Sequence, residues 1–353
     1  MPDSSADRRE NDSASSNGAD VVDEYADFEL PSYLGSTTFQ KLPLVADGAA
    51  LAARRPDAAI VGAPMDDGVS HRPGARFGPR AIRTASYHHG ELHSLQQGIN
   101  PFDWLDVVDA GDAPVVPGRA ERGHAVIRAK VLQVATIGAI PIVLGGDHSI
   151  TYPSASAVAE AVAPRRLGIV HFDAHADTGN STWGNLLSHG TPMRRLIESG
   201  AVAGRNFVQV GLRGYWPTAE TMAWMREQQM RWHLMTEIES RGADAVVGDA
   251  IAEALDGPDV IYLSVDIDVL DPGMAPGTGT PEPGGMLTRE LLRAVRQVVG
   301  SVTLVGMDVV EVAPAYDVSE VTAAAAHRCV LEAISALAAR RRDAREPARP
   351  TER

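Results

Sequence analysis

The chain has 353 residues, and its 32 Lys and Arg against 46 Asp and Glu give a formal net charge of −14. Nucleic acids and anionic membranes attract cationic surfaces, so this charge argues against both as partners. Hydrophobic residues make up 44% of the chain, which is enough for a sizeable core, and the single cysteine, Cys329, excludes a disulfide within the chain. No apolar run reaches the ~20 residues that a bilayer span needs, and the acidic N-terminus does not resemble a secretory signal. We therefore expect a soluble cytoplasmic protein.

The two ends of the chain differ in composition from the rest. Residues 1–25 are rich in Ser, Asp and Asn, which predicts a disordered acidic segment, and residues 28–45 are predicted to pack as an irregular arm. Residues 341–353 contain many Arg and two Pro, which is typical of a solvated tail. No linker or repeat interrupts the middle, so residues 26–340 are assigned to a single domain.

Between the ends, apolar runs alternate with segments of helical periodicity. Runs rich in Val and Ile predict strands at residues 58–64, 104–112, 139–147, 167–177, 206–212, 260–270 and 303–312. Helical patterns cover residues 120–138, 153–163, 191–199, 218–229, 243–256 and 288–299, and a long Ala-rich helix is expected at 319–340. Nearly continuous apolar strands are typical of parallel strands buried on both faces. The alternation therefore predicts an α/β fold with a mostly parallel sheet and helices on both of its faces.

Acidic residues and histidines concentrate where four of the predicted strands end. They are His148, then Asp173, His175 and Asp177, then Asp266 and Asp268, and finally Glu311. In open α/β sheets, ligands bind at the edge formed by the carboxyl ends of the strands. This edge is therefore the predicted functional site.

The spacing of these residues points to a metal centre. Side chains alternate in extended chain, so Asp173, His175 and Asp177 are expected to share one side of their strand, and Asp266 and Asp268 to do the same on theirs. Clustered carboxylates cannot all stay ionised without cations, because desolvation and mutual repulsion are severe. A donor set of carboxylates and imidazoles without thiolate suits Mn²⁺, so we expect a pair of manganese ions.

Each of the three motifs has an ordinary explanation when it is taken alone. The DxHxD motif could be a capped loop, SVDIDVLDP a strand followed by an Asx-Pro turn, and GGDHS a Gly-rich turn between a strand and a helix. All three occur together, each at a strand end, and that combination favours the metal centre.

Long segments of the chain resemble the ureohydrolase family, which includes arginase and agmatinase. The signature-like segments are GGDHS (145–149), FDAHAD (172–177), SVDIDVLDP (264–272) and GMDVVEVAP (306–314), while residues 72–83 and 275–285 resemble the agmatinase branch. The resemblance covers residues 40–338. It implies a three-layer α/β/α fold, two Mn²⁺ per subunit, a homotrimer or homohexamer, and hydrolysis of a guanidino group to urea and an amine.

The resemblance also implies roles for individual residues. His148, Asp173, Asp177 and Asp266 would bind one metal ion, and Asp173, His175, Asp266 and Asp268 the other, so that Asp173 and Asp266 bridge. Three catalytic residues are implied: His189 as the group that moves a proton to the leaving amine, Glu311 as the carboxylate that holds the guanidinium, and Asp177 as a hydrogen-bond partner of the attacking hydroxide. Asp147 and Asp308 are candidates for holding ligands in place.

The substrate is less constrained than the reaction. The loop at residues 178–190 does not resemble the arginase-type loop, so arginine is disfavoured; the first candidate is 4-guanidinobutyrate, followed by agmatine, other guanidino acids, and guanidine with Ni²⁺. Candidate pocket residues are His71, Arg72, Trp183, Asn185, Tyr215 and Trp216. Two other classes stay open: a two-metal phosphoesterase, against which a carboxylate such as Glu311 argues, and a non-catalytic metal-stabilised binding protein.

Overall fold

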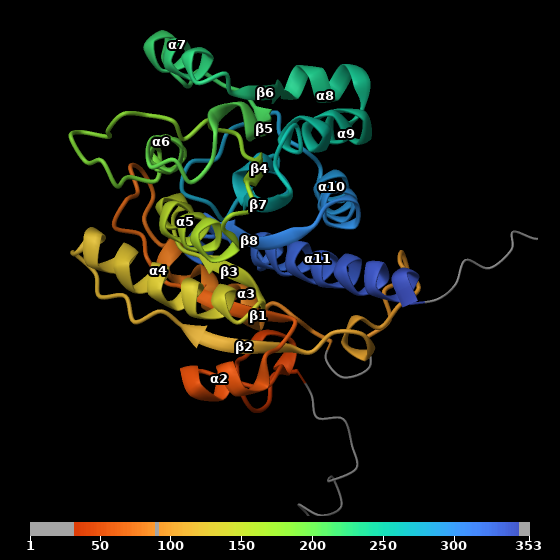
Figure 1. Cartoon of the computed structure of the whole chain (residues 1–353). Helices are drawn as coiled ribbons and strands as arrows, with labels where there is room; N and C mark the ends of the chain where they lie inside the picture. Colours follow the sequence, from red (N-terminus) through yellow and green to blue (C-terminus); the bar gives the residue numbers. More distant parts are fainter. Residues whose placement is uncertain (1–31, 89–91, 346–353) are drawn as a thin grey trace, which may run out of the picture.

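An eight-stranded parallel sheet runs through the middle of the molecule (Figure 1). The structure is a computed structural model that describes residues 32–88 and 92–345. The strands are β1 (Ala58–Ala63), β2 (Val107–Asp112), β3 (Ile140–Gly145), β4 (Leu167–Phe172), β5 (Phe207–Leu212), β6 (Arg231–Leu234), β7 (Val260–Asp266) and β8 (Leu304–Val310). Their order across the sheet is β2-β1-β3-β8-β7-β4-β5-β6, and every neighbouring pair is parallel. The predicted parallel sheet is confirmed.

Helices cover both faces of the sheet and complete a three-layer α/β/α fold (Figure 1). They are α2 (Gly48–Arg54), α3 (Gly78–Thr84), α4 (Ala120–Thr136), α5 (Thr151–Val162), α6 (Pro192–Glu198), α7 (Ala219–Glu227), α8 (Met235–Arg241), α9 (Ala243–Ala254), α10 (Thr288–Ser301) and α11 (Val321–Arg345). One core cluster packs strand side chains against α3, α9, α10 and α11, and a second packs the alternate strand side chains against α4, α5 and α6. The sheet thus separates two hydrophobic cores.

The seven predicted strands are present, whereas β6 and the short helices α2, α3 and α8 were not predicted. Strand β6 has only four residues and lies at the edge of the sheet next to β5, with two of its side chains half-buried and one exposed. A short edge strand of this kind lacks the continuous apolar run that marks central strands. Its sequence therefore carries a weak signal.

The described part of the N-terminal arm is irregular, as predicted, whereas the last helix extends beyond its predicted end. Residues 32–45 form an irregular arm with the short 3-10 turn η1 (Phe39–Lys41), and Leu44 pairs with Asp109 on the outer side of β2. Helix α11 continues to Arg345, so the predicted boundary at residue 340 falls inside it, and Arg341 forms an ion pair with Asp57. The predicted acidic segment, residues 1–25, and the last part of the predicted tail lie outside the described residues.

Helix α11 is long and apolar enough to cross a membrane by length and composition. In the structure, however, 72% of its most apolar window is buried inside the protein. It packs against α10 and α3 in the first core cluster. This helix therefore behaves as a core element of the α/β/α fold.

His327 on α11 is a buried histidine that fastens the arm to the core. Its Nδ1 donates to the Ile82 carbonyl oxygen at 2.8 Å, and its Nε2 accepts from the Gln40 amide at 2.8 Å. The Phe39 ring stacks on the imidazole with centroids 4.3 Å apart. Burial lowers the pKa of His327 to about 4. A protonated ring could not accept the Gln40 N–H, so the arm is held by the neutral form.

This arrangement makes the stability of the fold sensitive to acid. The unfolded histidine takes up a proton near its ordinary pKa of 6.5 and the folded one near about 4, so stability is lost as pH falls through this window. We expect the His327 contribution to the free energy of unfolding to fall by about 2 kcal/mol between about pH 7.5 and about pH 5. In His327→Gln, which keeps a donor and an acceptor, this part of the loss should disappear. Urea unfolding of both proteins at the two pH values measures it, and an unchanged loss in the variant would contradict the assignment.

Candidate metal centre

The four strand ends that carry acidic residues or histidines are neighbours in the sheet. Strands β3, β8, β7 and β4 occupy consecutive central positions (Figure 1), and each pairs in parallel with the next. Between β3 and the next turn, Gly146 has a φ of +21°, and a Cβ there would lie 2.5 Å from the carbonyl oxygens of Ala63 and Met65. Only glycine fits this crossing, which leads the chain into Asp147 and His148. The sheet topology thus brings the predicted ligands to one edge.

The ligand segments leave the strands as turns, which corrects the expectation of alternating extended chain. The predicted strands 167–177 and 260–270 end at Phe172 and Asp266. The Asp173 carboxylate accepts the His175 N–H at 2.6 Å, and Asp266 accepts the Asp268 N–H at 2.9 Å. These side-chain to backbone bonds bend the chain into Asx-type turns. The ligand side chains therefore converge because the chain turns. The segment Asp173–Asp177 has the capped-loop geometry that was considered as the ordinary explanation of DxHxD, and it also carries the predicted ligands.

Three overlapping groups of potential ligand atoms gather at this edge, and the third, His148, His171 and Asp173, includes a histidine that was not predicted. The first comprises His148, Asp173, Asp177 and Asp266, and the second comprises Asp173, His175 and Asp268. His148 Nδ1 lies 3.1 Å from Asp173 Oδ2 and 3.0 Å from an oxygen of Asp177 and one of Asp266. His175 Nδ1 lies 3.0 Å from Asp268 Oδ2. The structure thus brings all six predicted ligands together, with Asp173 common to all three groups; bridging by Asp266 stays a prediction.

The chemistry of the first group fits a cation. His148 Nε2 lies 3.0 Å from the Ser264 hydroxyl, which itself donates to Asp308 Oδ1 at 2.7 Å. Because the hydroxyl proton goes to Asp308, Ser264 accepts from His148 Nε2–H, and Nδ1 is the ring nitrogen that faces three carboxylate oxygens. Burial, with the charges of Asp268 and Asp173, raises the pKa of Asp266 well above its ordinary value. A ring nitrogen and three carboxylate oxygens this close together call for a positive charge between them, which a metal ion can supply.

Asp147 and Asp308, the two candidates for holding ligands in place, lie beside the ligand segments. Asp308 is fully buried and accepts three hydroxyl hydrogen bonds, from Ser264 and from two further residues, Tyr262 at 2.7 Å and Thr151 at 2.8 Å. Through Ser264 it fixes the tautomer in which His148 presents Nδ1 to the centre. Asp147 accepts the backbone N–H of Gly68 at 2.7 Å and so ties the loop before α3 to the edge of the sheet.

His189 and Glu311 form a hydrogen-bonded pair beside the two ligand groups. His189 Nδ1 lies 3.0 Å from Glu311 Oε1, and its Nε2 lies 2.7 Å from the Ser70 hydroxyl. Burial opposes protonation, but the charge of Glu311 and its hydrogen bond raise the pKa of His189 to about 9. Glu311 Oε1 also accepts the backbone N–H of His148 at 2.8 Å. The imidazole is thus held as a proton donor by the carboxylate that directly follows β8.

Glu311 is buried rather than a surface acid at a strand end. Its side chain is 1% exposed, and its Oε2 has no hydrogen-bond partner among the described residues. A Cβ at position 279 would lie 3.3 Å from Oε2, so a side chain at this position would press on the oxygen. Both Glu311 and Asp177 have a positive φ, of 65° and 49°, which costs free energy for residues other than glycine. Strain of this kind concentrates at functional sites.

A cavity of about 490 Å³ opens over the centre. It is lined by ligand residues, His189, hydroxyl side chains and two tryptophans: Ser70, His175, Ala176, Asp177, Thr178, Gly179, Ser181, Thr182, Trp183, His189, Gly190, Trp216, Pro217, Asp266 and Thr280. Trp183 and Trp216 are exposed at its mouth. Glu311 is not among the lining residues and reaches the cavity through His189. The lining contains no Arg or Lys, and its carboxylates are those of the ligand groups.

Four of the six candidate pocket residues lie outside this lining, which corrects that expectation. They are His71, Arg72, Asn185 and Tyr215. The Arg72 guanidinium lies 5.4 Å from the centroid of the Tyr316 ring, Asn185 accepts the Leu187 N–H within its own loop, and Tyr215 is fully exposed. Loop residues of this kind are placed by long-range packing that their own sequence does not reveal.

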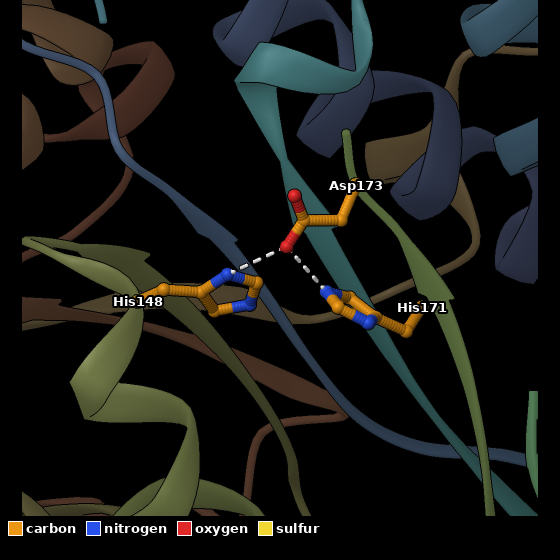
Figure 2. Close-up of side chains that lie close together, drawn as sticks. All are labelled: His148, His171 and Asp173. Atoms are coloured by element: carbon orange, nitrogen blue, oxygen red, sulfur yellow. Dashed lines mark hydrogen bonds and ion pairs between the residues drawn. The ribbon is translucent and has the colours of Figure 1, made fainter. Parts of the chain in front are cut away.

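Some residues of the site escaped the sequence analysis. His171 on β4 and Gln209 on β5 are fully buried and contact the ligand segment, and Thr280 Oγ1 lies 3.4 Å from Asp268 Oδ2. A signal for the first two was present, because each is a lone polar residue in an otherwise apolar strand. A buried polar side chain needs a partner, so such positions merit a search for one. Figure 2 shows His171 and His148 on opposite sides of the Asp173 carboxylate.

Comparison with known proteins supports the class that the fold and the centre suggest. The model of the arginase family matches residues 56–335. The chain is 40% identical to guanidinopropionase of Pseudomonas aeruginosa, over 88% of this chain and 94% of that protein, and 42% identical to mitochondrial agmatinase of Gallus gallus, over 76% and 77%. The structure of proclavaminate amidinohydrolase from Streptomyces clavuligerus superposes with a TM-score of 0.79 at 35% identity, covering 88% of this chain and 100% of that one.

The parallel sheet, the acidic edge and these similarities define a hydrolase of the ureohydrolase class. The chain belongs to the arginase family, as its resemblance to the signature segments predicted.

Proposed function

We propose that this protein hydrolyses the guanidino group of a small linear compound to urea and an amine, with 4-guanidinobutyrate as the first candidate substrate and 4-aminobutyrate as the product. The observation that carries the proposal is the convergence of two His/Asp ligand groups under a cavity that His189 also lines. We further propose two Mn²⁺ per chain, since carboxylate and imidazole donors without thiolate suit this ion. A homotrimer or homohexamer, which light scattering would measure, is proposed from the family resemblance.

The chain's own residues supply the remaining chemistry. A pair of divalent ions, when bound, lowers the pKa of water and so provides a nucleophile near neutral pH. Water adds to the guanidino carbon, the bond from that carbon to the alkyl-bearing nitrogen breaks, and the leaving nitrogen needs a proton. His189 is positioned to give that proton, because Glu311 keeps it protonated. Glu311 lies behind His189 and does not line the cavity, so its unpaired Oε2 would accept N–H groups of the planar cation, and fix its orientation, once the substrate reaches past His189.

The lining of the cavity supports a substrate whose far end is not a cation. No carboxylate other than those of the ligand groups lines the cavity to receive a terminal ammonium group. Side chains of Ser70, Ser181, Thr182 and Thr280 instead present hydroxyl groups, which can donate hydrogen bonds to a carboxylate. A guanidino acid therefore suits the cavity better than a diamine derivative.

A second candidate, agmatine, is favoured by one specific feature. The rings of Trp183 and Trp216 stand at the mouth of the cavity. An aromatic face attracts an alkylammonium group by about 0.5–2 kcal/mol, depending on how far the group is desolvated. The net charge of −14 also attracts a dication to the protein.

A urea-release screen separates these candidates. The purified chain is loaded with Mn²⁺ and given 4-guanidinobutyrate, 3-guanidinopropionate, agmatine, arginine and guanidine in parallel, with phosphate release from a phosphomonoester as the control for a phosphoesterase. We expect the highest kcat/KM on 4-guanidinobutyrate. A preference for agmatine would select the second candidate, whereas metal binding without urea from any compound would favour a binding protein.

Glu311→Gln tests the guanidinium-binding role. The amide keeps the shape of the side chain but loses its charge, so one charge-assisted hydrogen bond to the cation is weakened. We expect kcat/KM to fall about 10- to 100-fold, the equivalent of about 1.5–3 kcal/mol. Steady-state kinetics on the metal-loaded protein measure this, with Glu160→Gln, an exposed acid on α5, as the matched control. Unchanged kinetics in Glu311→Gln would refute the role.

A further inference from the structure

A buried imidazole on β4 contacts the carboxylate that the two ligand groups share. His171 is fully buried, and its Nε2 lies 2.8 Å from Asp173 Oδ2 (Figure 2). The same oxygen lies 3.1 Å from His148 Nδ1, so Oδ2 sits between two imidazole rings. The two rings meet edge to face with centroids 4.9 Å apart. The family resemblance gives His171 no metal-binding role, although it forms the third potential ligand group with His148 and Asp173.

Gln209 on β5 determines which nitrogen of His171 carries the proton. Its amide nitrogen lies 2.6 Å from the Ala176 carbonyl oxygen and 3.1 Å from His171 Nδ1. A carbonyl oxygen only accepts hydrogen bonds, so the amide must turn its NH₂ group toward Ala176. The second N–H of that group then points at Nδ1, which has to accept it. The proton of the neutral imidazole is therefore on Nε2, directed at Asp173.

This chain of hydrogen bonds fixes the orientation of the shared carboxylate. Asp173 Oδ1 accepts the backbone N–H of His175 at 2.6 Å, and Oδ2 accepts the N–H of His171. Each oxygen thus has one donor of its own, and the carboxylate cannot rotate without losing both bonds. In this orientation Oδ2 faces His148 in the first group, while Oδ1 is the oxygen nearer His175 in the second.

We propose that His171, backed by Gln209, is a positioning residue that holds the Asp173 carboxylate in the orientation needed to serve both metal-binding groups. The inference rests on the metal centre proposed above. Partners that hydrogen-bond to a metal ligand orient it, and their loss typically costs about 10- to 100-fold in metal affinity. Ala176, which binds the Gln209 amide, belongs to the same turn as Asp173. The turn therefore helps to orient Gln209, which orients His171, which in turn orients Asp173.

The alternative is that His171 only fills space. Its ring packs edge to face on Phe207, with centroids 5.7 Å apart, and on His148. Phenylalanine would keep both ring contacts and remove only the N–H. Glutamine at this position has the length to place an amide N–H near Nε2, so it can restore the donor without the ring. The pair of variants therefore separates hydrogen bonding from packing.

The test measures the affinity for Mn²⁺ alone, without substrate. Metal-stripped wild type, His171→Phe and His171→Gln are titrated with Mn²⁺ by calorimetry, and bound metal is counted by elemental analysis. We expect His171→Phe to bind Mn²⁺ about 10- to 100-fold more weakly and His171→Gln to recover most of the loss. His327→Phe, the same change at a buried histidine of the arm contact, should keep wild-type affinity. If His171→Phe does not fold, Gln209→Met, which frees the tautomer, should weaken binding in the same direction.

The outcomes separate this inference from the proposed function. Wild-type Mn²⁺ affinity in His171→Phe, or in Gln209→Met when His171→Phe is not folded, would overturn the positioning role and leave the metal centre intact. Weak binding in both His171→Phe and His171→Gln would also overturn it, because the ring and not the donor would then matter. If the wild-type chain itself bound no Mn²⁺, the metal centre would fail, and the positioning role with it.

Discussion

Asp268→Ala is expected to remove metal from the second ligand group and nearly all turnover. Asp268 Oδ2 lies 3.0 Å from His175 Nδ1, and its Oδ1 accepts the Ala174 N–H at 3.2 Å. The variant therefore removes one of the three members of this group and loosens the turn that carries another. Loss of a residue that merely supports a ligand costs about 10- to 100-fold, so the loss of a ligand should lower kcat by more than about 100-fold. Elemental analysis and urea release measure the two effects.

The control for Asp268→Ala is Asp249→Ala, which removes an exposed acid on α9 that pairs with Arg241. It should leave metal content and kcat as they are in the wild type. The first ligand group has all its members in both variants, so residual metal in Asp268→Ala should be bound there. Full metal content together with wild-type kcat in Asp268→Ala would show that our ligand assignment is wrong.

His189→Ala should separate metal binding from proton transfer. The side chain belongs to neither ligand group, so metal content should not change. Removal of a general acid typically lowers the rate about 10²- to 10⁴-fold, and we expect kcat to fall within this range. Because the step concerned is protonation of the leaving nitrogen, the effect should be larger on kcat than on KM. Metal analysis and steady-state kinetics on the preferred guanidino compound measure it.

Two further variants serve as controls for His189→Ala: His189→Gln tests for rescue, and His233→Ala removes a histidine outside the site. Glutamine can keep a hydrogen bond to Glu311 but cannot give up a proton, so it should not rescue kcat. His233 lies on the edge strand β6, where it is buried between Glu237 and Glu253. Its loss should leave kcat unchanged. An unchanged kcat in His189→Ala would refute the proton-donor role.

The sequence was sufficient to locate the site because its strongest signals are local. An apolar run that ends in an acid predicts both a buried strand and the edge at which its side chain lies, as for β7 and Asp266. The order of the strands in the sheet, and so which strand ends are neighbours, was not predictable in the same way. The order that places β8 between β3 and β7 depends on contacts between residues more than a hundred positions apart, such as His148 and Glu311.

The parts of the site that could not be predicted depend on geometry across strands. The turn at residues 173–177 looks like strand in the sequence, because its Ala residues continue the apolar alternation. The bond from His171 to Asp173 links residues two apart, but its direction is set by Gln209 on another strand. The positions of Trp216 at the cavity and of Tyr215 away from it are decided by loop packing, which neighbouring letters do not encode.

The last strand of the described residues, β8, occupies the middle of the sheet, and this has a consequence for biosynthesis. Until β8 has been translated, β3 and β7 each lack a neighbour, and the growing chain presents two unpaired apolar edges. Domains fold as units during synthesis, and exposed edges of this kind invite aggregation. Fragments that stop before Leu304 should therefore precipitate or be degraded instead of retaining partial activity. For this fold, release of the C-terminal segment from the ribosome sets the earliest moment at which a working enzyme can exist.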